Sequence, residues 1–211
     1  MIRDLVVIGV GFPDIVQIID DINNDKKQFN FLGFLDDNPN LKKYDLFGNK
    51  VIGNIDWLDT QKNVYVINTV GRNTKIRNIL NKKLIEKNTL QINLVHPSVN
   101  LKYVKIGNGN IISKNVYLEA KSTIKSNCMI LSNVTIGHDC VINDNCFIGP
   151  GAHILGGVTL NKNCFIGSGS VIHPKIKLED DTTVGINSCI FKDSIKGGTY
   201  LSLPSKLFLK S

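Results

Sequence analysis

A short glycine turn near the start of the chain has residue types that suit a phosphate group. The aliphatic run over residues 5–8 is typical of a buried parallel strand, and Gly9, Val10 and Gly11 follow it directly. With a helix expected over residues 13–23, such a turn directs free backbone N–H groups and a positive helix end at a phosphate. A tight strand-to-helix turn also needs glycine for steric reasons, so both interpretations stay open.

Two acidic residues could bind the ribose of a nucleotide. Asp36 and Asp37 follow a second expected strand, residues 29–35. In doubly wound sheets an acidic residue at this place commonly meets a ribose hydroxyl, although a solvated turn stopped by Pro39 is an equally good interpretation. Further strands are expected over residues 50–52, 64–68 and 90–95, with helical segments over 55–58 and 71–87. Residues 1–97 are therefore expected to form a small α/β nucleotide-binding domain that ends at His96 and Pro97.

The second half of the chain repeats every six residues. Aliphatic side chains recur without a miss at positions 106, 112, 118, 124, 130, 136, 142, 148, 154, 160, 166, 172, 178, 184 and 190. Most positions four residues later hold small or thiol side chains. Neither a helix nor a single strand has this period, so it predicts a repeat architecture. Three short strands per coil make a triangular prism, a parallel β-helix of about five coils and roughly 24 Å in height.

Residues directly after the large aliphatic side chains have turn chemistry. Glycine and asparagine take a positive φ at low cost, so we expect the turns of the β-helix there. These residues are Gly107, Gly137, Asn143, Gly149, Asn161, Gly167 and Gly185.

Neither the cysteines nor the histidines favour a metal site. Four of the five cysteines belong to the small-residue column, and no pair is spaced as CxxC, so zinc and disulfide interpretations are weak. His138, His153 and His173 fall near one corner in successive coils, which raises the possibility of a β-helical metalloenzyme such as a carbonic anhydrase. Their spread of roughly 10 Å is too long for one zinc ion with bonds of about 2 Å, so we expect no metal.

Composition limits the class of protein. The chain has 211 residues, 42% of them hydrophobic, which suits one large or two modest globular domains. No apolar run reaches the length of a membrane span, and no signal-peptide pattern begins the chain, so a cytoplasmic protein is expected. The net charge of +7 comes from scattered lysines without interleaved aromatic residues. This pattern disfavours nucleic acid and is compatible with small anionic substrates.

These features together resemble a known family. Gly9 to Gly11, the segment 33–37, Gly71-Arg72-Asn73, His96-Pro97, Gly137-His138-Asp139, Pro150-Gly151-Ala152 and the tail 203–206 are similar to motifs of the bacterial hexapeptide-repeat sugar acyltransferases. This family includes sialic acid O-acetyltransferases and UDP-amino-sugar N-acetyltransferases. The resemblance covers essentially the whole chain. It implies a Rossmann-like domain over residues 1–97, a left-handed β-helix with a C-terminal tail over 98–211, and a homotrimer with active sites between neighbouring prisms.

The resemblance also implies site residues. His138 is expected to be the general base, a role that suits imidazole at neutral pH, and Asp139 the acidic residue that holds the ring. Because adjacent strand residues point to opposite faces, this pairing requires a turn at Gly137. The nucleotide-linked sugar is expected at Gly9, Val10, Gly11, Asp36, Asp37, Gly71 and Arg72.

Acetyl-CoA is the implied acyl donor, and its predicted contacts are Phe147, Gly156, Gly157, Gly167 and Gly185. A coil has eighteen residues, so Gly156 stacks on His138, and the missing side chain could leave room for the pantetheine arm, although Gly156 and Gly157 could also be a simple turn. The basic segment 192–210 is expected either near the coenzyme phosphates or in solvent.

The sequence therefore predicts an acetyl-CoA-dependent N-acetyltransferase acting on the amine of a nucleotide-linked amino-deoxysugar. Sialic acid-type O-acetylation is the nearest alternative, because a hydroxyl needs the same base and thioester groove. A non-catalytic scaffold that binds sugar nucleotides is the third, and the presence of His138 and Asp139 argues against it.

Overall fold

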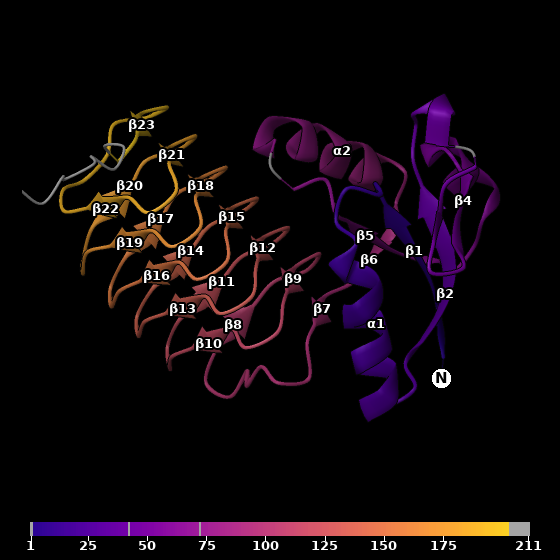
Figure 1. Cartoon of the computed structure of the whole chain (residues 1–211), viewed down its shortest axis with the longest axis horizontal. Coiled ribbons are helices and arrows are strands. Elements are labelled where there is room, and N and C mark those ends of the chain that lie inside the picture. Colours follow the sequence, from indigo (N-terminus) through magenta and orange to yellow (C-terminus); the bar gives the residue numbers. More distant parts are fainter. Residues whose placement is uncertain (1, 42, 72, 203–211) are drawn as a thin grey trace, which may run out of the picture.

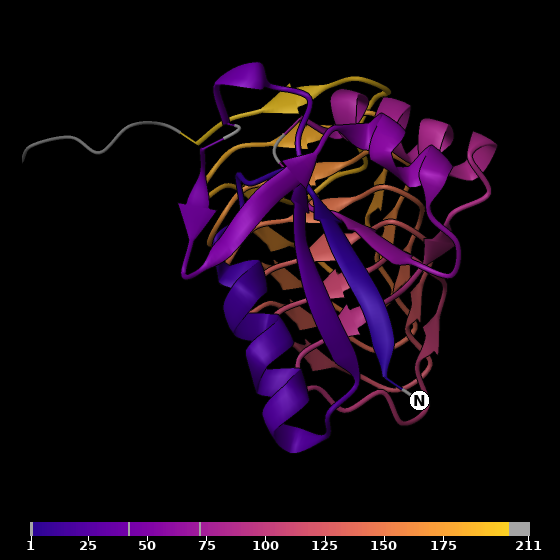
Figure 2. The ribbon, with the colours of Figure 1, turned by 90° about the vertical axis from the view of Figure 1, so that its right-hand side faces the viewer.

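The chain forms an α/β domain packed against one face of a long β-helix (Figure 1). The computed structural model describes residues 2–41, 43–71 and 73–202. Figure 2 shows the N-terminal sheet in front of the β-helix. No helix in the described part of the chain has the length and apolar character needed to cross a membrane.

The N-terminal sheet has the strand order β3-β4-β2-β1-β5-β6 and is parallel apart from the β3–β4 hairpin. Its strands are β1 (Arg3–Ile8), β2 (Phe29–Leu35), β3 (Asp45–Leu46), β4 (Asn49–Gly53), β5 (Tyr65–Asn68) and β6 (Leu90–Gln91). The helical elements are α1 (Asp14–Asp25), η1 (Pro39–Leu41), η2 (Ile55–Thr60) and α2 (Thr74–Glu86), of which η1 and η2 are 3₁₀ helices. The α/β domain with a parallel sheet expected from the sequence is therefore present.

Alternation along the strands divides the core of this domain between two faces. Leu5 and Val7 of β1 pack with α1, and their cluster includes Met129 and Phe147 of the β-helix. Val6 and Ile8 point the other way and pack with Leu84 of α2 and with η2. Helix α1 thus lies between the N-terminal sheet and the β-helix, and the two domains share a hydrophobic core.

The β-helix consists of two-residue strands in three parallel sheets. The sheets have the orders β10-β13-β16-β19-β22, β20-β17-β14-β11-β8 and β23-β21-β18-β15-β12-β9-β7. Their strands are β7 (Leu94–Val95), β8 (Lys105–Ile106), β9 (Ile111–Ile112), β10 (Tyr117–Leu118), β11 (Thr123–Ile124), β12 (Met129–Ile130), β13 (Thr135–Ile136), β14 (Val141–Ile142), β15 (Phe147–Ile148), β16 (His153–Ile154), β17 (Thr159–Leu160), β18 (Phe165–Ile166), β19 (Val171–Ile172), β20 (Lys177–Leu178), β21 (Thr183–Val184), β22 (Cys189–Ile190) and β23 (Thr199–Tyr200).

Residues eighteen positions apart pair between coils, as the six-residue period predicts. Ile112, Ile130, Ile148, Ile166 and Val184 stack in one register and are each 0% exposed. The small-residue column is buried as well, and its thiols donate hydrogen bonds to carbonyl oxygens of the next coil, 3.1 Å from Cys140 Sγ to Leu155 O. Burial raises the pKa of the Cys140 thiol, which keeps it protonated as a donor.

The expected strand over residues 90–95 is wrong, because it is two strands in different sheets. β6 pairs with β5 in the N-terminal sheet, whereas β7 pairs with β9 and begins the β-helix. Between them, Asn93 donates from Nδ2 to Gly107 O at 2.6 Å and accepts at Oδ1 from Asn110 N at 2.8 Å. These two hydrogen bonds attach the crossing segment to the first coil.

The predicted position of the positive-φ residues is also wrong. From Ile106 to Val184, the left-handed residues occur three positions after each large aliphatic side chain, for example Asn127 (φ 61°), Asn133 (φ 60°) and Asp139 (φ 57°). Glycine directly after the aliphatic residue has another cause. A Cβ on Gly137 would lie 2.7 Å from Gly156 N, so the close approach of successive coils requires its absence.

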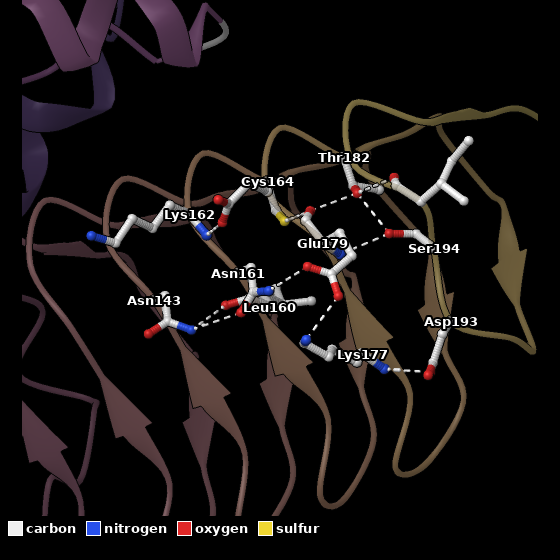
Figure 3. A network of polar contacts seen from close by, with 12 residues as sticks. Asn143, Leu160, Asn161, Lys162, Cys164, Lys177, Glu179, Thr182, Asp193 and Ser194 are labelled. Carbon is white, nitrogen blue, oxygen red and sulfur yellow. Dashed lines mark hydrogen bonds and ion pairs between the residues drawn. The ribbon is translucent and has the colours of Figure 1, made fainter.

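Asparagine at that same position forms a polar ladder instead (Figure 3). Asn143 Nδ2 donates to Leu160 O at 3.0 Å, and Asn161 Nδ2 donates to Glu179 Oε2 at 2.9 Å. Lys177 forms an ion pair with Glu179 at 2.7 Å, which lowers the pKa of that carboxyl group. The ladder satisfies polar groups along one edge of the prism.

The stacked interior predicts a large difference between neighbouring residues of one strand. Ile124 is 0% exposed, whereas Thr123 of the same strand points outward and is half-buried. Ile124→Ala is expected to lower the free energy of unfolding by about 2–5 kcal/mol, because it leaves a cavity. Thr123→Ala, the matched control, is expected to cost less than about 1 kcal/mol. Chemical denaturation followed by circular dichroism measures both, and equal losses would contradict the interior role.

Candidate active site

A cleft of about 880 Å³ separates the N-terminal domain from the β-helix. It is lined from the N-terminal side by residues 9–12, Asp36 and Gly71. Its β-helix side comprises Met129, Leu131, Phe147, Pro150, Phe165, Gly167, Ser168 and Ile186. The structure thus brings together five of the predicted sugar-nucleotide residues, namely Gly9, Val10, Gly11, Asp36 and Gly71, while Arg72 lies outside the described residues.

The glycine turn and the acidic pair are connected directly. Gly9 has a φ of 84°, and a Cβ there would lie 3.0 Å from Val70, whereas the position of a Cβ on Gly11 is open. Val10 N donates to Asp36 Oδ2 at 3.4 Å, which places this carboxylate beside the turn. Asp37 accepts from Ile55 N at 3.0 Å and lines an adjoining apolar cavity of about 220 Å³. The turn, Asp36 and the adjoining cavity form a continuous surface suited to a nucleotide.

The β-helix wall of the cleft is apolar. The rings of Phe147 and Phe165 stack with a centroid distance of 4.9 Å and an interplanar angle of 2°. Phe147 and Gly167, predicted to contact the acyl donor, therefore share the cleft with the predicted sugar-nucleotide residues. Gly185 lies one coil beyond Gly167, and a Cβ on it would lie 2.8 Å from Leu201.

His138 and Asp139 form a pair at another corner of the prism. Their side chains are 66% and 53% exposed, and His138 Nδ1 lies 2.8 Å from Asp139 Oδ2. Since a carboxylate only accepts hydrogen bonds, Nδ1 donates its proton and Nε2 keeps a lone pair. The left-handed conformation that lets adjacent side chains meet belongs to Asp139 itself and not to Gly137. The arrangement presents a largely exposed imidazole whose Nδ1 is held by a carboxylate.

Gly156 lies against the imidazole ring, as coil counting predicts. A Cβ on Gly156 would lie 2.7 Å from His138 Nε2 and 2.9 Å from Cε1. The space left by the missing side chain is therefore occupied by the ring itself. Gly157, with a φ of 73°, follows in the same corner and packs near Lys175.

His138 and the cleft lie on different parts of the prism. His138 is in the corner that joins the sheet of β13 to the sheet of β14, whereas the cleft follows the third sheet, of β12, β15 and β18, and the corner after it. In a triangular prism the first corner is opposite the third sheet. One chain alone therefore does not bring His138 to its own cleft.

The other histidines have different environments. His153 lies on β16 and is exposed, and the ring of His173 lies 5.7 Å from that of Phe191. His96 is buried, accepts from Ser98 N at Nδ1 and lies 3.0 Å from Asp21 Oδ2 through Nε2, so it attaches helix α1 to the segment that enters the β-helix. Within residues 2–41, 43–71 and 73–202, no group of three or more His, Cys, Asp or Glu is placed to hold a metal.

Arg77 is a buried residue that the sequence analysis missed. Its guanidinium donates to Asn145 Oδ1 at 2.7 Å, to Asn145 O at 2.6 Å and to Gly71 O at 3.4 Å. Burial lowers the pKa of Arg77 from its ordinary value. Arg77, Asn81 and Leu84 are the buried stripe of α2, at positions i, i+4 and i+7, so the helical spacing was the signal that could have identified it. The residue connects the wall of the cleft to the β-helix.

This buried contact generates a stability prediction. Asn145→Gly keeps the left-handed backbone and the carbonyl acceptor but removes the side-chain acceptor Oδ1 from a desolvated cation, so it is expected to cost about 1–3 kcal/mol in free energy of unfolding. Asn133→Gly is the matched control, since Asn133 is exposed with a φ of 60°. Denaturant titration of both variants is the measurement. Similar stability of the two would show that the Arg77 contact contributes little.

Comparison with known proteins supports the repeat and the fold. Residues 103–138 and 139–174 match the family model of the bacterial transferase hexapeptide, six repeats. No curated protein sequence matches the chain.

Several solved structures align over the full length. The acetyltransferase domain of PglB from Neisseria gonorrhoeae, in complex with acetyl coenzyme A, is 24% identical, with 99% of this chain and 100% of that chain covered and a TM-score of 0.85. A variant of perosamine N-acetyltransferase from Caulobacter crescentus, in complex with CoA and GDP-perosamine, is 23% identical, with coverages of 100% and 99% and a TM-score of 0.85. WeeI from Acinetobacter baumannii is 20% identical, with coverages of 98% and 100% and a TM-score of 0.81.

These likenesses show a shared fold over both domains, including the left hand of the β-helix that a six-residue period cannot indicate. The chain has the fold of a Rossmann-like domain followed by a left-handed β-helix, and residues 103–174 of that β-helix match the bacterial transferase hexapeptide repeat.

Proposed function

We propose that the protein is an acetyl-CoA-dependent N-acetyltransferase that acts on the amine of a nucleotide-linked amino-deoxysugar. The observation that carries the proposal is the exposed His138–Asp139 pair, in which Nδ1 is held and Nε2 is free to accept a proton. The solved proteins of the same fold support it, since one is an acetyltransferase domain in complex with acetyl coenzyme A and another an N-acetyltransferase with CoA and GDP-perosamine.

In the proposed reaction, the amine nitrogen attacks the thioester carbonyl carbon while His138 Nε2 takes a proton from it. The hydrogen bond to Asp139 keeps the imidazole in the required tautomer and stabilises the imidazolium that forms. The tetrahedral intermediate then collapses, the C–S bond breaks, and the imidazolium returns its proton to the thiolate of CoA. The amide product and free CoA leave, and His138 is neutral again.

The N-terminal cleft is the proposed sugar-nucleotide site. The turn at Gly9 and Gly11 suits the diphosphate, and Asp36 suits the ribose. The apolar wall of Met129, Phe147 and Phe165 suits a deoxysugar, in which one or more hydroxyl groups are missing. A cytoplasmic location belongs to the same proposal, as do Phe147, Gly157, Gly167 and Gly185 as contacts of the acyl donor. Gly156 has a different role, because its missing side chain makes room for the ring of His138.

The separation of His138 and the cleft supports an assembly of several copies, and we propose a homotrimer. Since His138 lies opposite the third sheet, a sugar held in the cleft of one subunit reaches a base only from a neighbouring subunit. We therefore propose that each active site combines the cleft of one chain with the His138 corner of the next.

Incubation with acetyl-CoA and a panel of UDP-, dTDP- and GDP-linked amino sugars tests the activity. A thiol reagent follows the release of CoA, and release that depends on one amino sugar is the expected result. Release with a sialic acid but with no amino sugar would indicate O-acetylation instead. Binding of a nucleotide sugar without any release would favour a scaffold.

His138→Ala is expected to lower kcat by about 100-fold or more, since removal of a general base costs that much. The affinity for the nucleotide sugar should stay unchanged, because the cleft is not altered. His153→Ala, an exposed histidine one coil away, is the matched control and should keep full activity. A His138→Ala enzyme with the rate of the wild type would remove this residue from the mechanism.

Mixed trimers test the shared site. Co-expression of His138→Ala chains with Gly11→Trp chains, in which the cleft is blocked, should produce activity that neither variant has alone, because some sites then combine an intact cleft with an intact base. No recovery in trimers verified by sedimentation would contradict a site between subunits.

A further inference from the structure

The backbone N–H of His138 donates to a side chain of the preceding coil, whereas equivalent amides at another corner donate to the next coil. At the corner that carries the polar ladder, the amide two positions after the large aliphatic residue donates to a side chain one coil later. Asn108 N donates to Ser126 Oγ at 3.2 Å, Ser126 N to Asp144 Oδ1 at 3.1 Å, and Lys162 N to Asp180 Oδ1 at 2.9 Å. Each pair is eighteen residues apart, so the next coil satisfies this amide.

His138 has no such partner available. The residue one coil later is Gly156, which has no side chain, and a Cβ there would collide with the imidazole. The position of the ring therefore excludes the acceptor that the other corner uses. His138 N donates instead to Glu119 Oε2 at 2.8 Å, from the preceding coil. Glu119 is half-buried and aligned with Gly137, because Leu118 pairs with Ile136.

We propose that Glu119 is a positioning residue for His138. Two carboxylates then fix His138. Asp139 accepts a hydrogen bond from Nδ1 of the ring, and Glu119 accepts one from the backbone N–H. The second bond is charge-assisted and therefore stronger than an amide–carbonyl bond. The His138 amide lies near solvent, so water can replace the carboxylate of Glu119 if that residue is substituted. Loss of the carboxylate therefore affects the placement of the imidazole more than the free energy of unfolding.

Three substitutions separate the hydrogen bond from the charge. Glu119→Gln keeps an acceptor at the same reach without charge, Glu119→Asp keeps the charge but shortens the reach, and Glu119→Ala removes both. Glu179→Ala is the matched control, because Glu179 occupies the equivalent place after a large aliphatic residue in the polar ladder at another corner (Figure 3).

The tautomer of His138, measured by long-range ¹H–¹⁵N correlation of the imidazole nitrogens, tests placement without any assay of activity. The wild type is expected to show a proton on Nδ1 of His138, whereas His96, whose Nδ1 accepts from Ser98 N, should show its proton on Nε2 and serves as an internal reference. Glu119→Ala and Glu119→Asp should shift His138 toward the Nε2–H tautomer, and Glu119→Gln and Glu179→Ala should not. An unchanged His138 spectrum in Glu119→Ala would overturn the proposal.

The kinetic part rests on the proposed function. Glu119→Ala and Glu119→Asp are expected to lower kcat about 10-fold with little change in KM, because the base is misplaced, while Glu119→Gln recovers most of the rate. Equal losses in Glu119→Gln and Glu119→Ala would assign the effect to charge and refute positioning through the hydrogen bond. If the wild type transfers no acetyl group, the proposed function fails, and the spectra still decide the role of Glu119.

Discussion

The stacking of aliphatic side chains inside the prism is the interaction on which the rest of the structure depends. Each large residue lies on its equivalent eighteen positions away, and the column is fully closed to water from Ile124 to Val184. Because neighbouring coils are held at the strand spacing of about 4.8 Å, every corner residue has a defined neighbour above and below. Side chains at a corner are therefore placed by the core and not by flexible loops.

Because the coils are regular, the residue types at each corner determine which polar contacts form there. At the corner that carries the polar ladder, side chains from one coil satisfy amides of the coil before it. At the His138 corner, the glycine at position 156 leaves that place to an imidazole, and Asp139 adopts a left-handed conformation so that its carboxylate reaches the ring. The corner proposed to be catalytic thus arises from substitutions within a structural repeat, without any change of the backbone path.

The N-terminal domain supplies one side of the cleft and is attached to the β-helix by buried groups. Arg77 binds the corner at Asn145 and also the carbonyl of Gly71 in the cleft wall, and His96 joins helix α1 to the entrance of the β-helix. A desolvated guanidinium has few alternative partners, so its contacts favour one placement of the cleft over the third sheet. That placement separates the cleft from His138 within one chain and makes neighbouring subunits part of the proposed mechanism.

The sequence by itself determined the repeat, the interior columns, the strand–turn–helix order of the first domain and the pairing of His138 with Gly156, because each follows from local period or from counting along a fixed coil. Only the tertiary structure decided the break between β6 and β7, the left-handed positions, the buried role of Arg77 and the approach of Glu119 to His138. These features depend on contacts between residues far apart in the chain or in different coils, where the direction of a side chain is set by its neighbours. The six-residue period shows which side chains are interior, whereas the packing of the coils determines which polar groups come into contact.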